Sequence, residues 1–155
     1  LCAQAAAGAD ALQVFDSWIG ALSPLDYRDY VLPHMKTLFA GLKKCKTPII
    51  HFGTGTATLL EMQKEAGGDV IGLDWRTPLD EGWKKVGYDV AVQGNLDPTA
   101  LLAPLPVLER QVDDILRRAE NRQGHIFNLG HGILPETKEE SVEAVIEWVH
   151  KKSAR

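Results

Sequence analysis

The sequence has few cysteines and no long apolar run. Its two cysteines, Cys2 and Cys45, do not form a CxxC pair. This argues against a disulfide scaffold and favours a reducing, cytoplasmic compartment. No apolar stretch approaches the roughly 20 residues of a membrane-spanning helix, so no membrane partner is expected. The first residues lack both an initiator Met and the basic start of a signal peptide. We therefore take Leu1 to be a cut point within a longer chain.

The sequence also has no excess of positively charged residues. Lys and Arg number 17 against 21 Asp and Glu, which gives a formal net charge of -4. No basic stripe alternates with aromatic residues, so no nucleic-acid partner is expected. The chain has 155 residues and is 45% apolar, which suffices for one domain with its own core. Because no linker or repeat divides it, we expect a single domain over residues 1–155.

Short apolar, β-branched segments recur along the chain, and each is followed by a helical pattern. Such near-continuous apolar runs are typical of parallel strands buried on both faces. The five predicted strands are residues 11–15, 48–52, 69–73, 88–92 and 124–129.

The predicted helices carry their own start and stop signals. Thr77 before a proline predicts a helix N-cap, and Gly87 predicts the end of that helix. Asp97, also before a proline, repeats the signal. Residues 137–140 read as a capping box that opens the last helix, and residues 30–42 are helical in pattern.

Strand and helix alternate throughout, which predicts an α/β fold with a parallel sheet. Two architectures fit. Five units over 155 residues have about the spacing of a (β/α)8 barrel of roughly 250 residues, so the chain can be five-eighths of such a barrel. It can also be a complete, flavodoxin-like doubly wound domain. Pattern alone favours the second, because a whole domain is the simpler reading.

Polar residues gather at the carboxyl ends of the predicted strands, where ligands bind in both architectures. All five ends should face one mouth. The polar segments are residues 16–18, 53–56, 74–76, 93–95 and 128–132.

His131 and Ser17 are the best candidates for a site. His131 lies between two glycines, which let the backbone approach a ligand, and an imidazole can move a proton near neutral pH. It can instead be a loop histidine that only bonds a neighbouring turn. Ser17 can bond a ligand carboxylate or, alternatively, serve as an N-cap for the next helix.

Other polar residues favour structural roles. Asp74 and Arg76 are expected to form an ion pair on the rim, although both can face a ligand. Residues 53–56 can cradle an anion, but they lack the full dinucleotide fingerprint, and a tight turn is the better interpretation. His51, inside its strand, is expected to be packed. The tryptophans are expected in the core or an interface: Trp18, Trp75, Trp83 and Trp148.

Four blocks of the sequence closely resemble those of the uroporphyrinogen decarboxylase family. They occur in family order and cover nearly the whole chain, so together they are highly specific. The blocks are Gln13-Val14-Phe15-Asp16-Ser17-Trp18, Val70-Ile71-Gly72-Leu73-Asp74-Trp75, Val92-Gln93-Gly94-Asn95-Leu96-Asp97-Pro98 and Phe127-Asn128-Leu129-Gly130-His131-Gly132-Ile133.

The resemblance reverses the preference drawn from pattern. It implies about the last five strand-helix units of a (β/α)8 barrel. It also implies that His131 is a catalytic and substrate-binding residue and that Ser17 binds substrate. The implied substrate is the tetrapyrrole uroporphyrinogen, decarboxylated without metal or organic cofactor by a homodimeric enzyme. The family's substrate-binding arginines, its pyrrole-binding aspartate and its active-site tyrosine belong to the other half of that barrel.

A related branch of zinc-dependent methyltransferases uses a His-x-Cys motif and a later Cys. In this chain the segment at the position of the His-x-Cys motif is His51-Phe52-Gly53, and the position of the later Cys is occupied by His131. Zinc activation of a thiol needs thiolate ligands. The sequence therefore argues against a zinc site.

Overall fold

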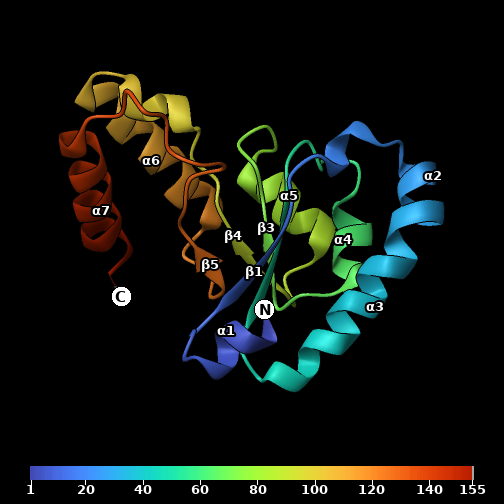
Figure 1. Cartoon of the computed structure of the whole chain (residues 1–155). Helices are drawn as coiled ribbons and strands as arrows, with labels where there is room; N and C mark the ends of the chain where they lie inside the picture. Colours follow the sequence, from blue (N-terminus) through green and yellow to red (C-terminus); the bar gives the residue numbers. More distant parts are fainter. Residues whose placement is uncertain (155) are drawn as a thin grey trace.

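The computed structural model describes residues 1–154 and contains one curved, five-stranded parallel sheet (Figure 1). The strand order is β1-β2-β3-β4-β5, so every strand pairs with its sequence neighbour. A doubly wound domain would place a later strand between earlier ones. The order therefore excludes the flavodoxin-like alternative and confirms an arc of a (β/α)8 barrel. The strands are β1 (Leu12–Asp16), β2 (Ile49–Gly53), β3 (Val70–Gly72), β4 (Ala91–Gln93) and β5 (His125–Ile126).

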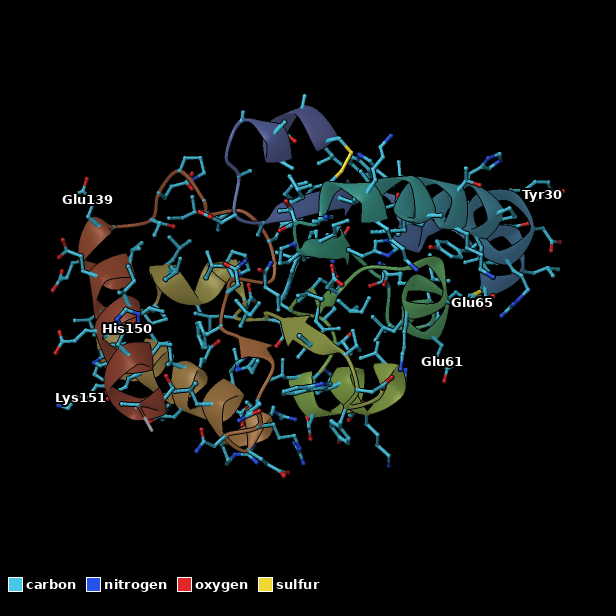
Figure 2. The ribbon with its side chains drawn as sticks, turned by 90° about the horizontal axis from the view of Figure 1, so that it is seen from below. Tyr30, Glu61, Glu65, Glu139, His150 and Lys151 are labelled. Atoms are coloured by element: carbon cyan, nitrogen blue, oxygen red, sulfur yellow. A yellow bond between two sulfur atoms is a disulfide. The ribbon has the colours of Figure 1, made fainter. Side chains whose placement is uncertain are left out.

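Helices connect the strands and cover the outer face of the arc. In Figure 1, α3, α4 and α5 flank one side and α6 and α7 the other. Seen from below, the labelled side chains of Tyr30 and Glu139 point outward from the molecule (Figure 2). The helices are α1 (Cys2–Ala6), α2 (Pro24–Asp26), α3 (Leu32–Leu42), α4 (Leu60–Ala66), α5 (Leu79–Val86), α6 (Leu105–Ala119) and α7 (Glu139–Ser153), with the short turns η1 (Ile19–Ala21), η2 (Tyr27–Val31), η3 (Lys43–Cys45) and η4 (Pro98–Leu102). No helix within residues 1–154 is both long and apolar enough to cross a bilayer.

Strand register divides the side chains into an outer row and an inner row. Paired residues of parallel strands point to the same face, and the face alternates along each strand. The outer row packs under the helices, against Trp83 on one flank and Tyr27 on the other, both buried. This outer row consists of Val14, His51, Ile71, Val92 and His125.

Several local predictions need correction. The fourth strand begins at Ala91 rather than residue 88. The preceding Asp89 side chain points outward and forms an ion pair with Lys64. β5 is shorter than predicted. Helix α7 is capped by Lys138 without a side-chain bond, so the capping box does not form. Its Thr137 hydroxyl is buried without a hydrogen-bond partner among the described residues.

Other signals are confirmed. Helix α5 ends at the predicted Gly87, although it begins at Leu79, one residue later than expected. The Asp97 carboxylate accepts a hydrogen bond from the Thr99 amide at 2.8 Å and so caps η4 as predicted. Trp83 is a core residue, whereas Trp18 is 89% exposed and is not.

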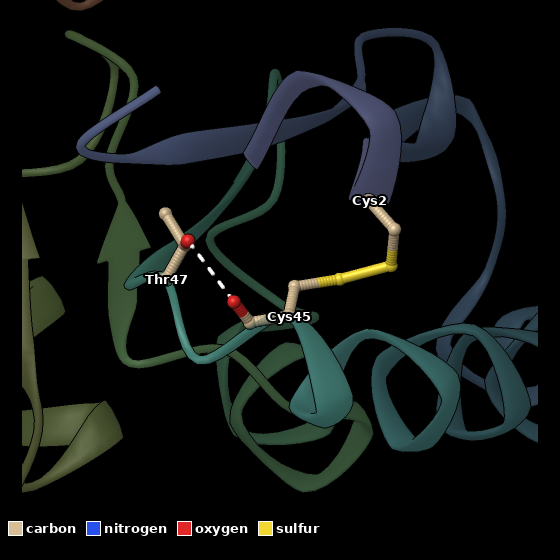
Figure 3. The surroundings of a disulfide bond; sticks show 3 residues. All are labelled: Cys2, Cys45 and Thr47. Atoms are coloured by element: carbon tan, nitrogen blue, oxygen red, sulfur yellow. Dashed lines mark hydrogen bonds between the residues drawn. A yellow bond between two sulfur atoms is a disulfide. The ribbon is translucent and has the colours of Figure 1, made fainter. Parts of the chain in front are cut away.

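Cys2 and Cys45 form a disulfide (Figure 3), contrary to the expectation that they remain unpaired. Their spacing in sequence gave no hint of it. They meet because the segments before β1 and β2 reach the same edge of the sheet, where the Leu12 amide donates to the Pro48 carbonyl at 2.9 Å. The two α-carbons lie 5.5 Å apart, within the usual disulfide range. The pairing also removes the cysteine-based argument for a reducing compartment.

Breaking this disulfide should destabilise the fold. It closes a segment of 43 residues, and cross-links of such length typically contribute about 2–4 kcal/mol by restricting the unfolded chain. We expect Cys2→Ser to lower the free energy of unfolding in urea by that amount. A reductant should lower the wild-type value equally and leave the variant unchanged. Equal wild-type midpoints with and without reductant would contradict this.

The packed His51 makes stability depend on pH. It is fully buried, and its Nδ1 lies 3.2 Å from the carbonyl oxygens of Gln63 and Gly67. Burial lowers the pKa of the imidazole, although the two carbonyls oppose that shift. The folded state therefore favours neutral His51, whereas the unfolded chain protonates it near its ordinary pKa of 6.5.

We expect the contribution of His51 to the free energy of unfolding to be fully present above pH 6.5 and to be lost as the pH falls below it. The unfolded state binds more protons there, which costs up to about 1.4 kcal/mol per pH unit for one group. The pKa of His125 is lowered by burial as well, so His51→Gln should reduce the slope between pH 7.5 and 5 without abolishing it. His34→Gln, at an exposed position, is the matched control. Identical slopes for wild type and His51→Gln would refute the assignment.

Candidate functional site

The inner face of the arc is hollowed at the carboxyl ends of the strands. Gln93 on β4 donates a hydrogen bond from Nε2 to Oε1 of Gln13 on β1, at 3.4 Å. These strands are not neighbours, so only curvature brings their side chains together. Above them lies a hollow of about 430 Å³, a size typical of ligand sites. It is lined by Gln13, Phe15, Ser17, Phe52, Gln93, Asn128, Leu129, His131, Gly132 and Ile133.

Aromatic residues of the inner row form one wall of this hollow. Phe15 and Phe52 are paired in register, and their rings meet edge to face with centroids 6.0 Å apart. The next position on β3 is Gly72, where a Cβ atom would lie 2.8 Å from the Phe52 ring. Phe15 is 68% exposed. The wall is therefore apolar and open, beside the neutral amides of two glutamines.

His131 reaches the hollow from the loop after β5. The Gly130 amide donates to the Leu96 carbonyl at 2.7 Å. A Cβ atom on Gly130 would lie 2.9 Å from Cβ of Trp75, so only glycine allows this approach. Gly132 faces open space and is not needed for packing. The imidazole is exposed and makes no hydrogen bond within residues 1–154, so it does not merely bond a neighbouring turn; its ring lies edge to face with Trp75, centroids 5.9 Å apart.

Ser17 lines the same hollow from the end of β1. Its carbonyl oxygen accepts a hydrogen bond from the Thr54 hydroxyl, which ties it to the turn after β2. The following turn η1 is capped by Trp18 without a side-chain bond. The structure therefore contradicts the N-cap alternative for Ser17. The two predicted residues, 17 and 131, are brought together as the sequence indicated.

Asp74 has a structural role at the tip of β3. It is 1% exposed, and its Oδ2 accepts hydrogen bonds from the Gly55 amide at 2.6 Å and from Arg76 at 2.9 Å. The predicted ion pair with Arg76 is thus confirmed. Asn95 donates to the backbone carbonyls of Asp74 and Thr77 at 2.8 and 2.5 Å. These bonds join the loops after β2, β3 and β4.

The segment 53–56 is a turn rather than an anion cradle. Its Gly55 amide is already bonded to Asp74, and α4 begins only at Leu60. The turn packs so closely on Gly20 that a Cβ atom there would lie 2.7 Å from the Gly55 α-carbon. No anion is needed to explain its conformation.

Asp16 faces away from the hollow, toward the helical layer. Burial raises the pKa of its carboxyl group. Tyr27 is fully buried, and burial together with the charge of Asp16 raises its pKa to about 12. The tyrosine therefore stays neutral at physiological pH. Asp16, next to Ser17 in sequence, does not line the hollow.

Sequence reasoning placed the lining residues of the polar strand ends at the mouth, but it missed Gln13, Phe15, Phe52 and Ile133. The first three lie inside strands, and which face each occupies depends on register. Alternation along a strand divides its side chains between the two faces of the sheet, but it does not tell which face lines the hollow. Trp75 was expected in the core or an interface and instead contacts His131.

The described residues contain no group of three His, Cys, Asp or Glu side chains arranged to hold a metal ion. Cys2 and Cys45 are bonded to each other at the amino-terminal edge of the strands, whereas the hollow lies at the carboxyl ends. They are not placed to serve as thiolate ligands there.

Comparisons with known proteins bear on the whole chain. The family model described as "Uroporphyrinogen decarboxylase (URO-D)" matches residues 1–152. A uroporphyrinogen decarboxylase from Sorangium cellulosum is 59% identical over 97% of this chain and 43% of its own length. One from Carboxydothermus hydrogenoformans is 56% identical over 99% and 44%, and one from Thermus thermophilus is 58% identical over 99% and 45%. The chain thus spans less than half the length of these relatives.

A solved structure supports the fold alone. A methyltransferase from Methanosarcina mazei superposes with a TM-score of 0.84 over 98% of this chain and 45% of that chain, at 19% identity. The strand order, the blocks around residues 17 and 131, and the family model all agree. The chain belongs to the uroporphyrinogen decarboxylase family.

Proposed function

We propose that residues 1–155 form one domain, the carboxyl-terminal part of an enzyme that decarboxylates the four acetate groups of uroporphyrinogen III to give coproporphyrinogen III. The observation that carries the proposal is that Ser17 and His131 line one hollow. They come from opposite ends of the sequence, and the family resemblance singled out both. The names of the relatives support the same substrate.

The chemical problem is the electron pair left behind when CO2 departs. Protonation of a pyrrole carbon turns the ring into an electron sink, so the bond between the methylene and carboxylate carbons can break. The methylene then gains a proton and becomes a methyl group, and the ring loses its extra proton. The enzyme must supply a positioned proton donor and fix the carboxylates.

We assign these tasks to the two residues that the hollow presents. The His131 imidazole can bind an acetate or propionate group or donate a proton, and it has no competing hydrogen bond within the described residues. Ser17 can orient a carboxylate through its hydroxyl. The walls supply neutral amides and aromatic surface, which suit a tetrapyrrole ring more than its charged rim.

The hollow lacks the cations that eight carboxylates require. None of its lining residues is Lys or Arg. The Arg76 guanidinium stacks on the Trp75 ring and is already paired with Asp74. The remaining cations must come from the part of the enzyme that this chain does not span. A homodimer and a cytoplasmic location belong to the same proposal, because the resemblance implies them for the intact enzyme.

The proposal can be tested in a full-length hybrid in which this chain replaces the corresponding part of the Thermus thermophilus relative. Loss of a hydrogen bond to a charged group costs about 1.5–3 kcal/mol. We therefore expect His131→Gln and Ser17→Ala each to lower kcat/KM for uroporphyrinogen III at least about tenfold. His34→Gln, exposed on α3, is the control and should match the unmodified hybrid. Near-normal turnover by His131→Gln would remove it as an essential acid.

The 155-residue chain by itself should be inactive. Its hollow has no cation for the substrate carboxylates, and its inner face is open on the side of Phe15, which is 68% exposed. We expect no release of CO2 from uroporphyrinogen III above the uncatalysed rate when the purified chain is assayed. The unmodified hybrid serves as the positive control. Measurable turnover by the chain would overturn this expectation.

A further inference from the structure

The His131 ring contacts the ring of Trp75. The ring centroids lie 5.9 Å apart with an interplanar angle of 80°, a favourable edge-to-face arrangement. Within residues 1–154 no hydrogen bond or ion pair holds the imidazole. We propose that Trp75 is a positioning residue that fixes the orientation of His131 at the mouth of the hollow.

The backbone that carries His131 is already fixed by other contacts. Leu129 forms a bridge with Leu96, and the Gly130 amide bonds the Leu96 carbonyl at 2.7 Å. Gly130 also lies against the backbone and Cβ of Trp75. The remaining freedom of His131 is rotation about its side-chain bonds. Contact with the indole is what restricts that rotation.

Trp75 is itself held by a charged neighbour. The Arg76 guanidinium carbon lies 4.0 Å from the centroid of the indole ring, a stacking arrangement for a cation on an aromatic face. Arg76 is held in this position because its NH1 group donates a hydrogen bond to the buried Asp74 carboxylate at 2.9 Å. Asp74 is anchored in turn by the Gly55 amide. A continuous series of contacts therefore leads from the buried carboxylate to the imidazole.

Trp75 lines a second hollow, next to the one that His131 lines. His131 lines the inner hollow of about 430 Å³, whereas Trp75 and Arg76 line a separate, outer hollow of about 610 Å³. In the proposed arrangement, contact with the indole holds the imidazole at the inner hollow. An imidazole fixed in this way loses less freedom when a ligand binds, which favours binding and reaction.

The first test uses the 155-residue chain and does not depend on its function. In NMR spectra of the wild type we expect nuclear Overhauser contacts between the Trp75 and His131 ring protons. In Trp75→Leu the His131 ring protons should move toward the shifts of a free histidine. Trp75→Phe should preserve most of the displacement, and Trp18→Leu, at a largely exposed tryptophan, should not change it. Absence of the contacts in the wild type overturns the proposal even if Trp75→Leu fails to fold.

The second test uses the full-length hybrid and rests on the proposed function. An aromatic pair contributes enough that its loss should lower kcat for uroporphyrinogen III about three- to tenfold, with a smaller change in KM. Trp75→Phe should restore most of the turnover, whereas Trp18→Leu should leave the kinetics unaltered. A Trp75→Leu hybrid with unaltered kcat would refute positioning in the reaction.

The two tests separate the two hypotheses. If His131→Gln leaves the hybrid fully active, the proposed role of His131 fails, while the NMR contacts still decide whether Trp75 orients the imidazole. If His131→Gln is impaired but the His131 shifts do not respond to Trp75→Leu, the positioning role fails and the proposed function stands.

Discussion

Each strand of the sheet pairs in parallel, in register, with the strand that precedes it in sequence. This pairing fixes which side chains face the helices and which face the hollow. It also curves the sheet, as the contact between Gln13 and Gln93 across three strand intervals shows. The polar residues after the strands then converge without any sequence proximity. This pairing brings residues 17 and 131 to the same hollow.

The buried carboxylate of Asp74 adds rigidity where the loops meet. A buried charge is costly unless its oxygens are bonded. Here the Gly55 amide and the Arg76 side chain satisfy it, and Asn95 secures the backbone on the other side. The loops after three consecutive strands are thereby joined. The site is built from loops, and these hydrogen bonds hold the loops together.

Much of this architecture could be predicted from the sequence. The strands, the helices and the polar strand ends follow from periodicity and from signals such as Gly87 and Asp97, which the structure confirms. The choice between a barrel arc and a doubly wound domain needed the family resemblance, because strand order leaves no local trace. The contact of Trp75 with His131 was beyond local reasoning. It requires Gly130 to approach another loop, and no spacing in the sequence reveals that approach.

The bond between Cys2 and Cys45 also governs how the chain responds to proteases. Exposed residues such as Leu25, at 67% exposure, lie between the two cysteines. A cut there would leave two pieces that remain covalently attached until a reductant separates them. Both β1 and Ser17 lie on the piece that contains Cys2, so in a nicked chain the disulfide would still tether them to the piece that carries β2.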